Sequence, residues 1–178
     1  MDINSVKGFD GPYEAPLRLP SRKVLKSWID YNGHMNVAYY TMAIDNSIDH
    51  FLEEILGIGE THAKSNDQGP FVVQANFSYL NEMIYKQKFF VQCSLINFDK
   101  KKMHLFLEII SSSNNEVMAF CEQLLLNVNL KKRKTENYPE ADLLINENLA
   151  FKINNSLELN LVLGGGTILF NWVFSIFF

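Results

Sequence analysis

Apolar positions along this chain follow two different spacings, and the change of spacing separates a helix from strands. Between residues 37 and 55 the apolar side chains recur as on one helix face, at Val37, Tyr40, Ile44, Ile48, Phe51, Leu52 and Ile55. Asn36 precedes this run and is a favourable N-cap, because its side-chain oxygen can accept a hydrogen bond from the first turn. Gly57 follows it as a stop signal. The pattern predicts one long helix over residues 36–56.

The remaining apolar segments alternate with a period of two, which is typical of strands. In residues 71–80 one face carries the apolar side chains Phe71, Val73, Ala75, Phe77 and Tyr79, and the opposite face carries Gln74, Asn76 and Ser78. Residues 15–29 are expected to form a first strand, and residues 57–69 a polar loop. Further strands are expected over 89–98, 103–111 and 117–130, joined by turns at 99–101 and 114–115.

One strand, one long helix and a four-strand meander indicate an α+β fold, because no β-α-β alternation appears. A lone antiparallel sheet needs its apolar face covered, and the long helix can cover it. We therefore expect a five- to six-stranded antiparallel sheet curled around one helix. The 178 residues suit a single domain over residues 15–140, with an arm at residues 1–14 and an extension at 141–178.

Composition narrows the class of protein. The net charge of −4 gives no nucleic-acid signal, and the N-terminus has no apolar segment typical of a secretory signal. The cytoplasm is thus the expected location. Cys93 and Cys121 lie in apolar strand-like runs and are expected to be reduced and buried. The histidines show no ligand spacing, which argues against a metal site, and no Gly-x-Ser-x-Gly elbow of a serine hydrolase is present.

The C-terminal stretch leaves three alternatives open. Residues 159–178 contain no charged residue, and about twenty residues are enough to span a bilayer. Three consecutive glycines at 164–166 weaken any helix there. The stretch could be a membrane tail, an element docked on the body or on a partner, or a non-functional end.

Candidate chemistry gathers in the run Trp28-Ile29-Asp30-Tyr31-Asn32-Gly33-His34-Met35-Asn36. Asn32-Gly33 is a strong turn dipeptide, which folds Asp30 back beside the start of the helix. Unpaired N–H groups and the positive end of the helix dipole lie there. A carboxylate in that place can attack or deprotonate while the amides stabilise a developing oxyanion. Asp30 could instead only hydrogen-bond its own loop.

The run D-Y-N-G-H-M-N followed by an aromatic-rich helix resembles the hot-dog-fold acyl-CoA thioesterases of the 4-hydroxybenzoyl-CoA thioesterase type. It is most similar to the thioesterase domain fused to some L-carnitine dehydrogenases and to its free-standing relatives. The resemblance covers roughly residues 15–140 and continues through residues 71–80, 100–106 and 121–128. It implies the hot-dog fold and hydrolysis of an acyl-CoA to free acid and CoA, with no cofactor beyond the CoA of the substrate. A small polar acyl group, of the betainyl or carnitine type, is the expected substrate.

By this resemblance Asp30 is the catalytic carboxylate, as nucleophile or general base, and the backbone N–H of Val37 is the oxyanion donor. His34 could orient the substrate or Asp30, or its ring could close the turn by bonding backbone. Asn36 could be an N-cap, a catalyst or both, and Asn32 and Gly33 could contact substrate or serve the turn alone.

Further candidates for substrate binding lie outside the turn. Asp45 could join a polar network beside the active site or be solvated. Gln74 and Asn76 stand where the fusion-type relatives carry Glu and His, so a different acyl preference is expected if they line the pocket. Lys131 and Arg133 belong to a basic run that could meet the phosphates of CoA, or be a solvated strand end. Glu122 shares a strand face with apolar neighbours and needs a partner if it is buried.

Two rival functions remain open: a hot-dog hydratase or dehydratase, and a protein that binds acyl-CoA without turnover. Hot-dog proteins of this kind pair their sheets edge to edge, so the resemblance also implies a homodimer or homotetramer with the pocket between subunits.

Overall fold

A computed structural model of the chain describes residues 15–139, so the predictions for residues 1–14 and 141–178 lie outside the described residues. The elements are, in order, β1 Leu17–Arg18, β2 Arg22–Lys23, a 3₁₀ turn Lys26–Trp28, α1 Val37–His50, a π-helical segment Phe51–Leu56, α2 Glu60–Asn66, β3 Gln68–Tyr79, β4 Lys88–Phe98, β5 Lys102–Ser111, β6 Val117–Asn129 and β7 Lys134–Thr135.

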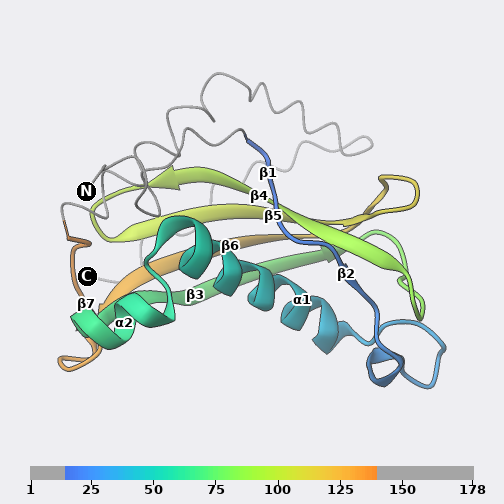
Figure 1. Cartoon of the computed structure of the whole chain (residues 1–178), viewed down its shortest axis with the longest axis horizontal. Coiled ribbons are helices and arrows are strands. Elements are labelled where there is room, and N and C mark those ends of the chain that lie inside the picture. The colour runs from blue at the N-terminus through green and yellow to red at the C-terminus, as the bar shows by residue number, and fades with distance from the viewer. Residues whose placement is uncertain (1–14, 140–178) are drawn as a thin grey trace.

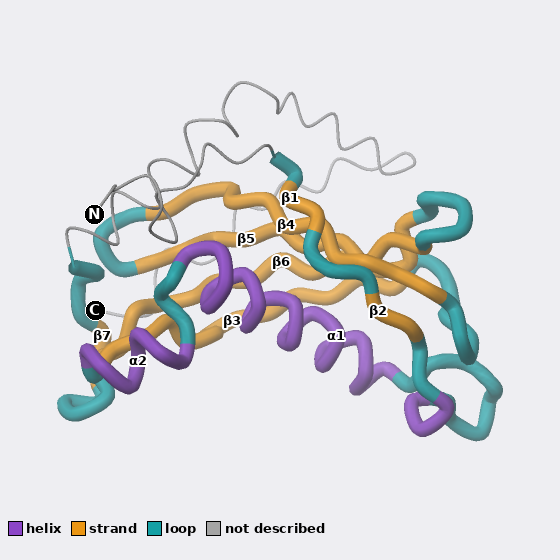
Figure 2. Tube along the Cα trace, in the orientation of Figure 1, coloured by secondary structure: helices purple, strands orange, loops and turns teal. Residues whose placement is uncertain are grey.

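The strands form one antiparallel sheet that curls around α1 (Figure 1, Figure 2). The order is β1-β4-β5-β6-β3, with β2 paired to β4 and β7 paired to β6, which makes seven strands within the described residues. The predicted α+β fold, a sheet curled around one long helix, is confirmed. The strand number exceeds the predicted five to six because β1, β2 and β7 are two-residue strands that pair only briefly.

The long helix is confirmed, with Asn36 as its N-cap. The Asn36 side chain accepts a hydrogen bond from the Ala38 N–H at 3.0 Å. The apolar stripe buries one face of α1 against the sheet, and the π-helical segment continues it to Leu56. Gly57 ends the helix in the left-handed region at φ 71°, where glycine avoids the steric cost of a side chain.

The core lies between α1 and the concave face of the sheet. On β5 the alternation is complete, since Met103, Leu105, Leu107 and Ile109 are all fully buried. Cys93 and Cys121 flank Leu107 on the neighbouring strands. Both are free, buried cysteines, as predicted, and burial raises the pKa of each thiol to about 12.

Two predicted segments differ from the structure. Residues 15–29 form two short strands and a 3₁₀ turn rather than one strand, because Pro16 and Pro20 cannot donate ladder hydrogen bonds. Residues 57–69 contain α2, which the polar composition concealed. The Thr61 N–H at its start donates to the Glu53 carboxylate at 3.0 Å, so this helix is capped from the preceding one.

The predicted four-strand meander holds only for β4, β5 and β6. β3 pairs with β6 at the far edge of the sheet and not with β4. The connection between β3 and β4 spans residues 80–87, which is longer than the two to five residues of a usual hairpin loop. That length lets the chain cross the end of the sheet before it pairs again.

A β-bulge divides β3 into two registers. The pairing with β6 shifts between Val72 and Gln74, so Val73 is the extra residue. As a result Ala75, Phe77 and Tyr79 share the inner face with Val72, while Phe71 joins the outer face. The prediction that Phe71 lies on the same face as Tyr79 is therefore wrong, and Val73 stands outside the alternation as the extra residue.

Within residues 15–139, every helix is too short or too polar to cross a membrane.

Candidate active site

The run between residues 28 and 36 folds as a tight turn that delivers the chain into α1. Ile29 and Met35 form an antiparallel bridge, and the Asn36 N–H donates to the Trp28 carbonyl at 2.9 Å. Inside this bridge the Asp30 N–H donates to the His34 carbonyl at 3.0 Å. The backbone of Asp30 is thus fixed directly before the start of the helix.

Asp30 is half-buried, and its two carboxylate oxygens differ in their surroundings. Oδ1 accepts the Asn32 N–H at 2.8 Å, which is the loop contact that short acidic residues favour in turns. Oδ2 has no hydrogen-bond partner among residues 15–139. The carboxylate is therefore held by one oxygen and free for chemistry at the other.

The first turn of α1, at the end of the same turn as Asp30, supplies a free backbone donor. The side chain of Asn36 is engaged by Ala38, and the Tyr39 N–H donates to the Asn36 carbonyl at 2.9 Å. The Val37 N–H has no acceptor within the part of the chain that the structure describes. A free N–H at a helix start carries partial positive charge and suits an incoming anion.

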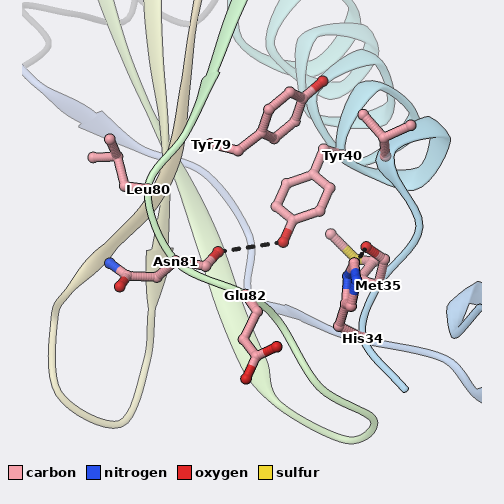
Figure 3. Close-up of a pocket in the computed structure, with 8 residues that line it drawn as sticks. His34, Met35, Tyr40, Tyr79, Leu80, Asn81 and Glu82 are labelled. Carbon is pink, nitrogen blue, oxygen red and sulfur yellow. Dashed lines mark hydrogen bonds between the residues drawn. The ribbon is translucent and has the colours of Figure 1, made fainter. Parts of the chain in front are cut away.

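A cavity of about 360 Å³ opens at this helix start. It is lined from the turn and α1 on one side and from the end of β3 and the following loop on the other, by His34, Met35, Val37, Tyr40, Tyr79, Leu80, Asn81 and Glu82 (Figure 3). Its size lies at the small end of the range for ligand sites.

Two tyrosines form one wall of the cavity. The rings of Tyr40 and Tyr79 meet edge to face with their centroids 5.1 Å apart. The Tyr40 hydroxyl donates to the Asn81 carbonyl at 3.3 Å (Figure 3). Burial raises the pKa of Tyr40 most, the charge of Glu82 raises it further, and a hydrogen bond to the Met83 backbone opposes both. The phenol is therefore a fixed neutral donor at neutral pH.

The structure brings together the predicted residues of the turn and the helix start. His34 and Val37 line the cavity, and Asp30, Asn32, Gly33 and Asn36 belong to the same turn but do not line it. The Nδ1 atom of His34 lies 3.2 Å from the Met35 carbonyl oxygen. The ring thus contacts both the backbone and the cavity.

The other predicted binding residues lie elsewhere in this subunit. Asp45 is exposed two turns further along α1, and Gln74 and Asn76 are exposed on the outer face of β3. Lys131 and Arg133 are exposed in the turn between β6 and β7, at the opposite end of β3. Figure 1 shows β7 at the other end of the sheet from the start of α1. None of these five residues lines the cavity of its own subunit.

The basic run is partly engaged in local ion pairs. Lys131 Nζ lies 2.6 Å from Asp67 Oδ2, and Lys132 Nζ lies 2.7 Å from Glu136 Oε1. Arg133 stacks its guanidinium 5.8 Å from the Phe71 ring centroid and has no carboxylate partner among residues 15–139.

Glu122 forms a close contact with His104, as expected for a carboxylate on a strand face with apolar neighbours. Its Oε1 lies 2.6 Å from His104 Nε2 on the neighbouring strand β5, and both side chains are about a third exposed. The pair lies on the outer face of the sheet, away from the cavity. Within residues 15–139 no group of His, Cys, Asp or Glu is arranged to hold a metal ion.

Comparison with known proteins assigns the family. Residues 24–149 match the model of the thioesterase-like superfamily, which is more than half of the chain. The chain belongs to this superfamily. This membership agrees with the turn, the helix start and the sheet described above.

Curated relatives carry a more specific name. The chain is 29% identical over 126 residues to an L-carnitine dehydrogenase/betainyl-CoA thioesterase of Rhizobium, covering 71% of this chain and 25% of that protein. It is 26% identical over 118 residues to the betainyl-CoA thioesterase of Pseudomonas aeruginosa, covering 66% of this chain and 69% of that protein. The match thus spans about a quarter of the length of the fused relative.

Solved structures share the fold of this superfamily member. A Staphylococcus aureus protein in complex with CoA superposes with a TM-score of 0.73 at 20% identity, covering 87% of this chain and 97% of that one. A 1,4-dihydroxy-2-naphthoyl-CoA thioesterase from Synechocystis superposes with a TM-score of 0.64 at 13% identity, covering 72% and 93%. These likenesses support the hot-dog architecture.

Sequence reasoning did not assign Tyr40, Tyr79 and Glu82 to the site. Tyr40 was predicted only as part of the helix's apolar stripe, and Tyr79 only as part of a strand face. Their common place in the site depends on the end of β3 lying beside the start of α1, which no local pattern encodes. Glu82 lies in the loop three residues after the end of β3, and nothing in the sequence pattern marked it.

Proposed function

We propose that this chain is a thioester hydrolase that converts an acyl-CoA to a free acid and CoA. The observation that carries the proposal is the pairing of a half-free carboxylate at Asp30 with a free N–H at Val37 across one tight turn. A nucleophile or base beside an oxyanion donor is the arrangement that acyl transfer from a thioester requires.

Two routes are compatible with this geometry. In the first, Asp30 Oδ2 attacks the thioester carbonyl carbon, the carbon–sulfur bond breaks, CoA leaves as the thiol after taking a proton, and water then hydrolyses the mixed anhydride. In the second, Asp30 takes a proton from water, the hydroxide attacks the carbonyl carbon, and that proton passes to the departing thiolate. In both, the Val37 N–H stabilises the tetrahedral oxyanion.

An edge-to-edge homodimer, alone or as half of a homotetramer, completes the proposed site. The outer edge of β3 has no strand partner among residues 15–139, and an open edge of this length is a liability in an isolated subunit. If two copies pair their β3 strands antiparallel, the Gln68 end of one strand comes beside the Tyr79 end of the other. The two ends of the strand then contribute to the same site.

This pairing gives the basic run its proposed role. Lys131 and Arg133 lie at the Gln68 end of β3, so they would approach the cavity of the partner subunit. Phosphate groups are well matched by a guanidinium without a carboxylate partner. We therefore propose that CoA binds across the dimer, with its phosphates toward this end.

A small polar acyl group is the proposed substrate. The cavity is small, and the named relatives are betainyl-CoA thioesterases. The reaction uses water and the CoA of its own substrate, so we propose no further cofactor, and the cytoplasm remains the expected location.

Two other functions are distinguished by their products. A hydratase or dehydratase would leave CoA attached to the acyl group, and a binding protein would leave the thioester intact. Release of free thiol separates the proposed function from both.

The test is thiol release from a panel of acyl-CoAs, with the protein compared with Asp30→Asn. We expect the variant to lose activity by about a thousandfold, within the usual range for a missing nucleophile or general base. Glu116→Gln is the matched control, because Glu116 is exposed in the turn after β5 and lies outside the cavity. Thiol release that survives in folded Asp30→Asn would reject the mechanism.

A further inference from the structure

We infer that the cavity at the start of α1 binds a quaternary ammonium group of the acyl chain, held between the aromatic wall of Tyr40 and Tyr79 and the carboxylate of Glu82. The inference rests on the proposed thioesterase function and assigns the specificity of the same site to residues outside the catalytic turn.

The aromatic wall is preorganised. Tyr79 stacks on Phe77 with ring centroids 6.0 Å apart and an interplanar angle of 9°, and it meets Tyr40 edge to face at an interplanar angle of 78°. Tyr40 is itself buried and held by Asn81, whereas Tyr79 is 47% exposed. The exposed ring therefore presents aromatic surface that packing has fixed in place.

The charge of the cavity favours a cation. Glu82 is the only acidic side chain that lines it, and no lysine or arginine of the described residues does so. Among residues 15–139 the Glu82 carboxylate forms neither an ion pair nor a hydrogen bond. In Figure 3 it lies at one end of the cavity, with Tyr40 between it and Tyr79.

A quaternary ammonium fits these features better than other small groups. Aromatic faces attract a quaternary ammonium, and they do so more strongly where water is excluded. A quaternary ammonium has no N–H group and so needs no hydrogen-bond acceptors around it. An aromatic wall, which offers few acceptors, can therefore bind it. An anionic acyl group would be repelled by Glu82, and a neutral one would gain nothing from it.

The test compares betainyl-CoA with 3,3-dimethylbutyryl-CoA, its neutral isostere in which carbon replaces the charged nitrogen. We expect the protein to hydrolyse betainyl-CoA with a kcat/KM at least about tenfold higher, given the usual strength of a partly desolvated cation–π contact. Glu82→Gln should lower kcat/KM for betainyl-CoA about tenfold and leave that for the isostere unchanged. Tyr79→Leu should reduce the preference in the same way, and Tyr79→Phe should retain it because the aromatic face remains.

The possible failures are distinguishable. Equal activity on both substrates, or an equal loss on both in Glu82→Gln, would reject the ammonium site and leave the thioesterase function standing. Thiol release from neither substrate by the folded protein would overturn the proposed function and this inference together. Glu116→Gln serves as the matched control, since it removes an exposed carboxylate outside the cavity.

Discussion

The strands β3 and β5 both pair with β6, one on each side, yet they differ sharply in burial. On β5 every second side chain from Met103 to Ile109 is fully buried. On β3 residues 71–76 are all exposed, including Val72 and Val73 at 43% and 52%. Both strands carry a period-two pattern, so the difference comes from their places in the sheet.

This difference separates the part of the sheet that is buried within one subunit from the part whose apolar surface stays exposed in one subunit. β5 is the centre of the sheet and is covered by α1, so its burial is settled within one subunit. β3 is an edge strand, and Phe71, Val72 and Val73 remain 40–52% exposed among residues 15–139. Apolar residues along an exposed edge favour pairing with another strand, which agrees with the proposed dimer.

The first prediction measures this difference as stability. Leu107→Ala should lower the free energy of unfolding by about 3 kcal/mol, because it opens a cavity in a fully buried layer. Val73→Ala should cost less than about 0.5 kcal/mol in the isolated subunit, since its side chain is already half exposed. Urea unfolding at low protein concentration, where an edge-paired dimer is dissociated, checks both values. Similar losses for the two variants would contradict the comparison.

The second prediction concerns a substitution that prevents strand pairing at the edge of β3. Val73→Lys places two like charges near each other if β3 strands pair across a two-fold axis, so the dimer should dissociate. Thiol release should then fall about tenfold or more, because each proposed site loses the partner's contribution. Light scattering gives the mass, and the thiol assay gives the activity.

Ile96→Lys is the matched control for this variant. Ile96 is the extra residue of the bulge in β4 and is 46% exposed, much like Val73. It lies on a different strand, so the dimer and the activity should persist. A Val73→Lys protein that stays dimeric and active would show that β3 is not the interface.

Comparing β3 with β5 also shows which parts of the fold could be predicted from the sequence. The alternation of β5, the length of α1 and its Asn36 cap are set by neighbours in the chain, and each was predicted. The bulge at Val73 and the pairing of β3 with β6 were not, because periodicity identifies a strand but not its neighbour. The helix α2 was missed because its cap is the side chain of Glu53, on the preceding helical segment.

The residues of the site also fall into those that local sequence predicts and those that only the tertiary fold brings in. Asp30, His34, Asn36 and Val37 lie within one short turn, so local turn chemistry placed them together. Glu82 lies near them only because the connection after β3 crosses the end of the sheet, and the sequence pattern contained no sign of that contact. A residue proposed to act across a subunit interface, such as Arg133, reaches its site only when two subunits associate. Local sequence patterns do not predict that association.

The last prediction concerns the outer face of β5, where the effect should be smallest. Glu108 lies between Gln92 and Phe120 on the neighbouring strands, and burial raises its carboxyl pKa. A raised pKa means that folding disfavours the charged form of Glu108. At low pH the carboxyl is protonated and does not lower the free energy of unfolding. The destabilisation appears as the pH rises past the pKa that Glu108 has in the unfolded chain. Glu108→Gln should therefore stabilise the protein at pH 7.5, by less than about 1 kcal/mol because the group remains partly solvated.

At pH 3.5 the difference between Glu108→Gln and the parent should shrink, because the parent carboxyl is then mostly protonated in both the folded and unfolded states. Urea unfolding at the two pH values measures it, with Glu116→Gln as the exposed control that changes little at either. A Glu108→Gln protein that is less stable at pH 7.5 would mean that the carboxylate makes a favourable contact on this face. Burial would then not be the dominant influence on Glu108, and that contact would count among those that stabilise β5.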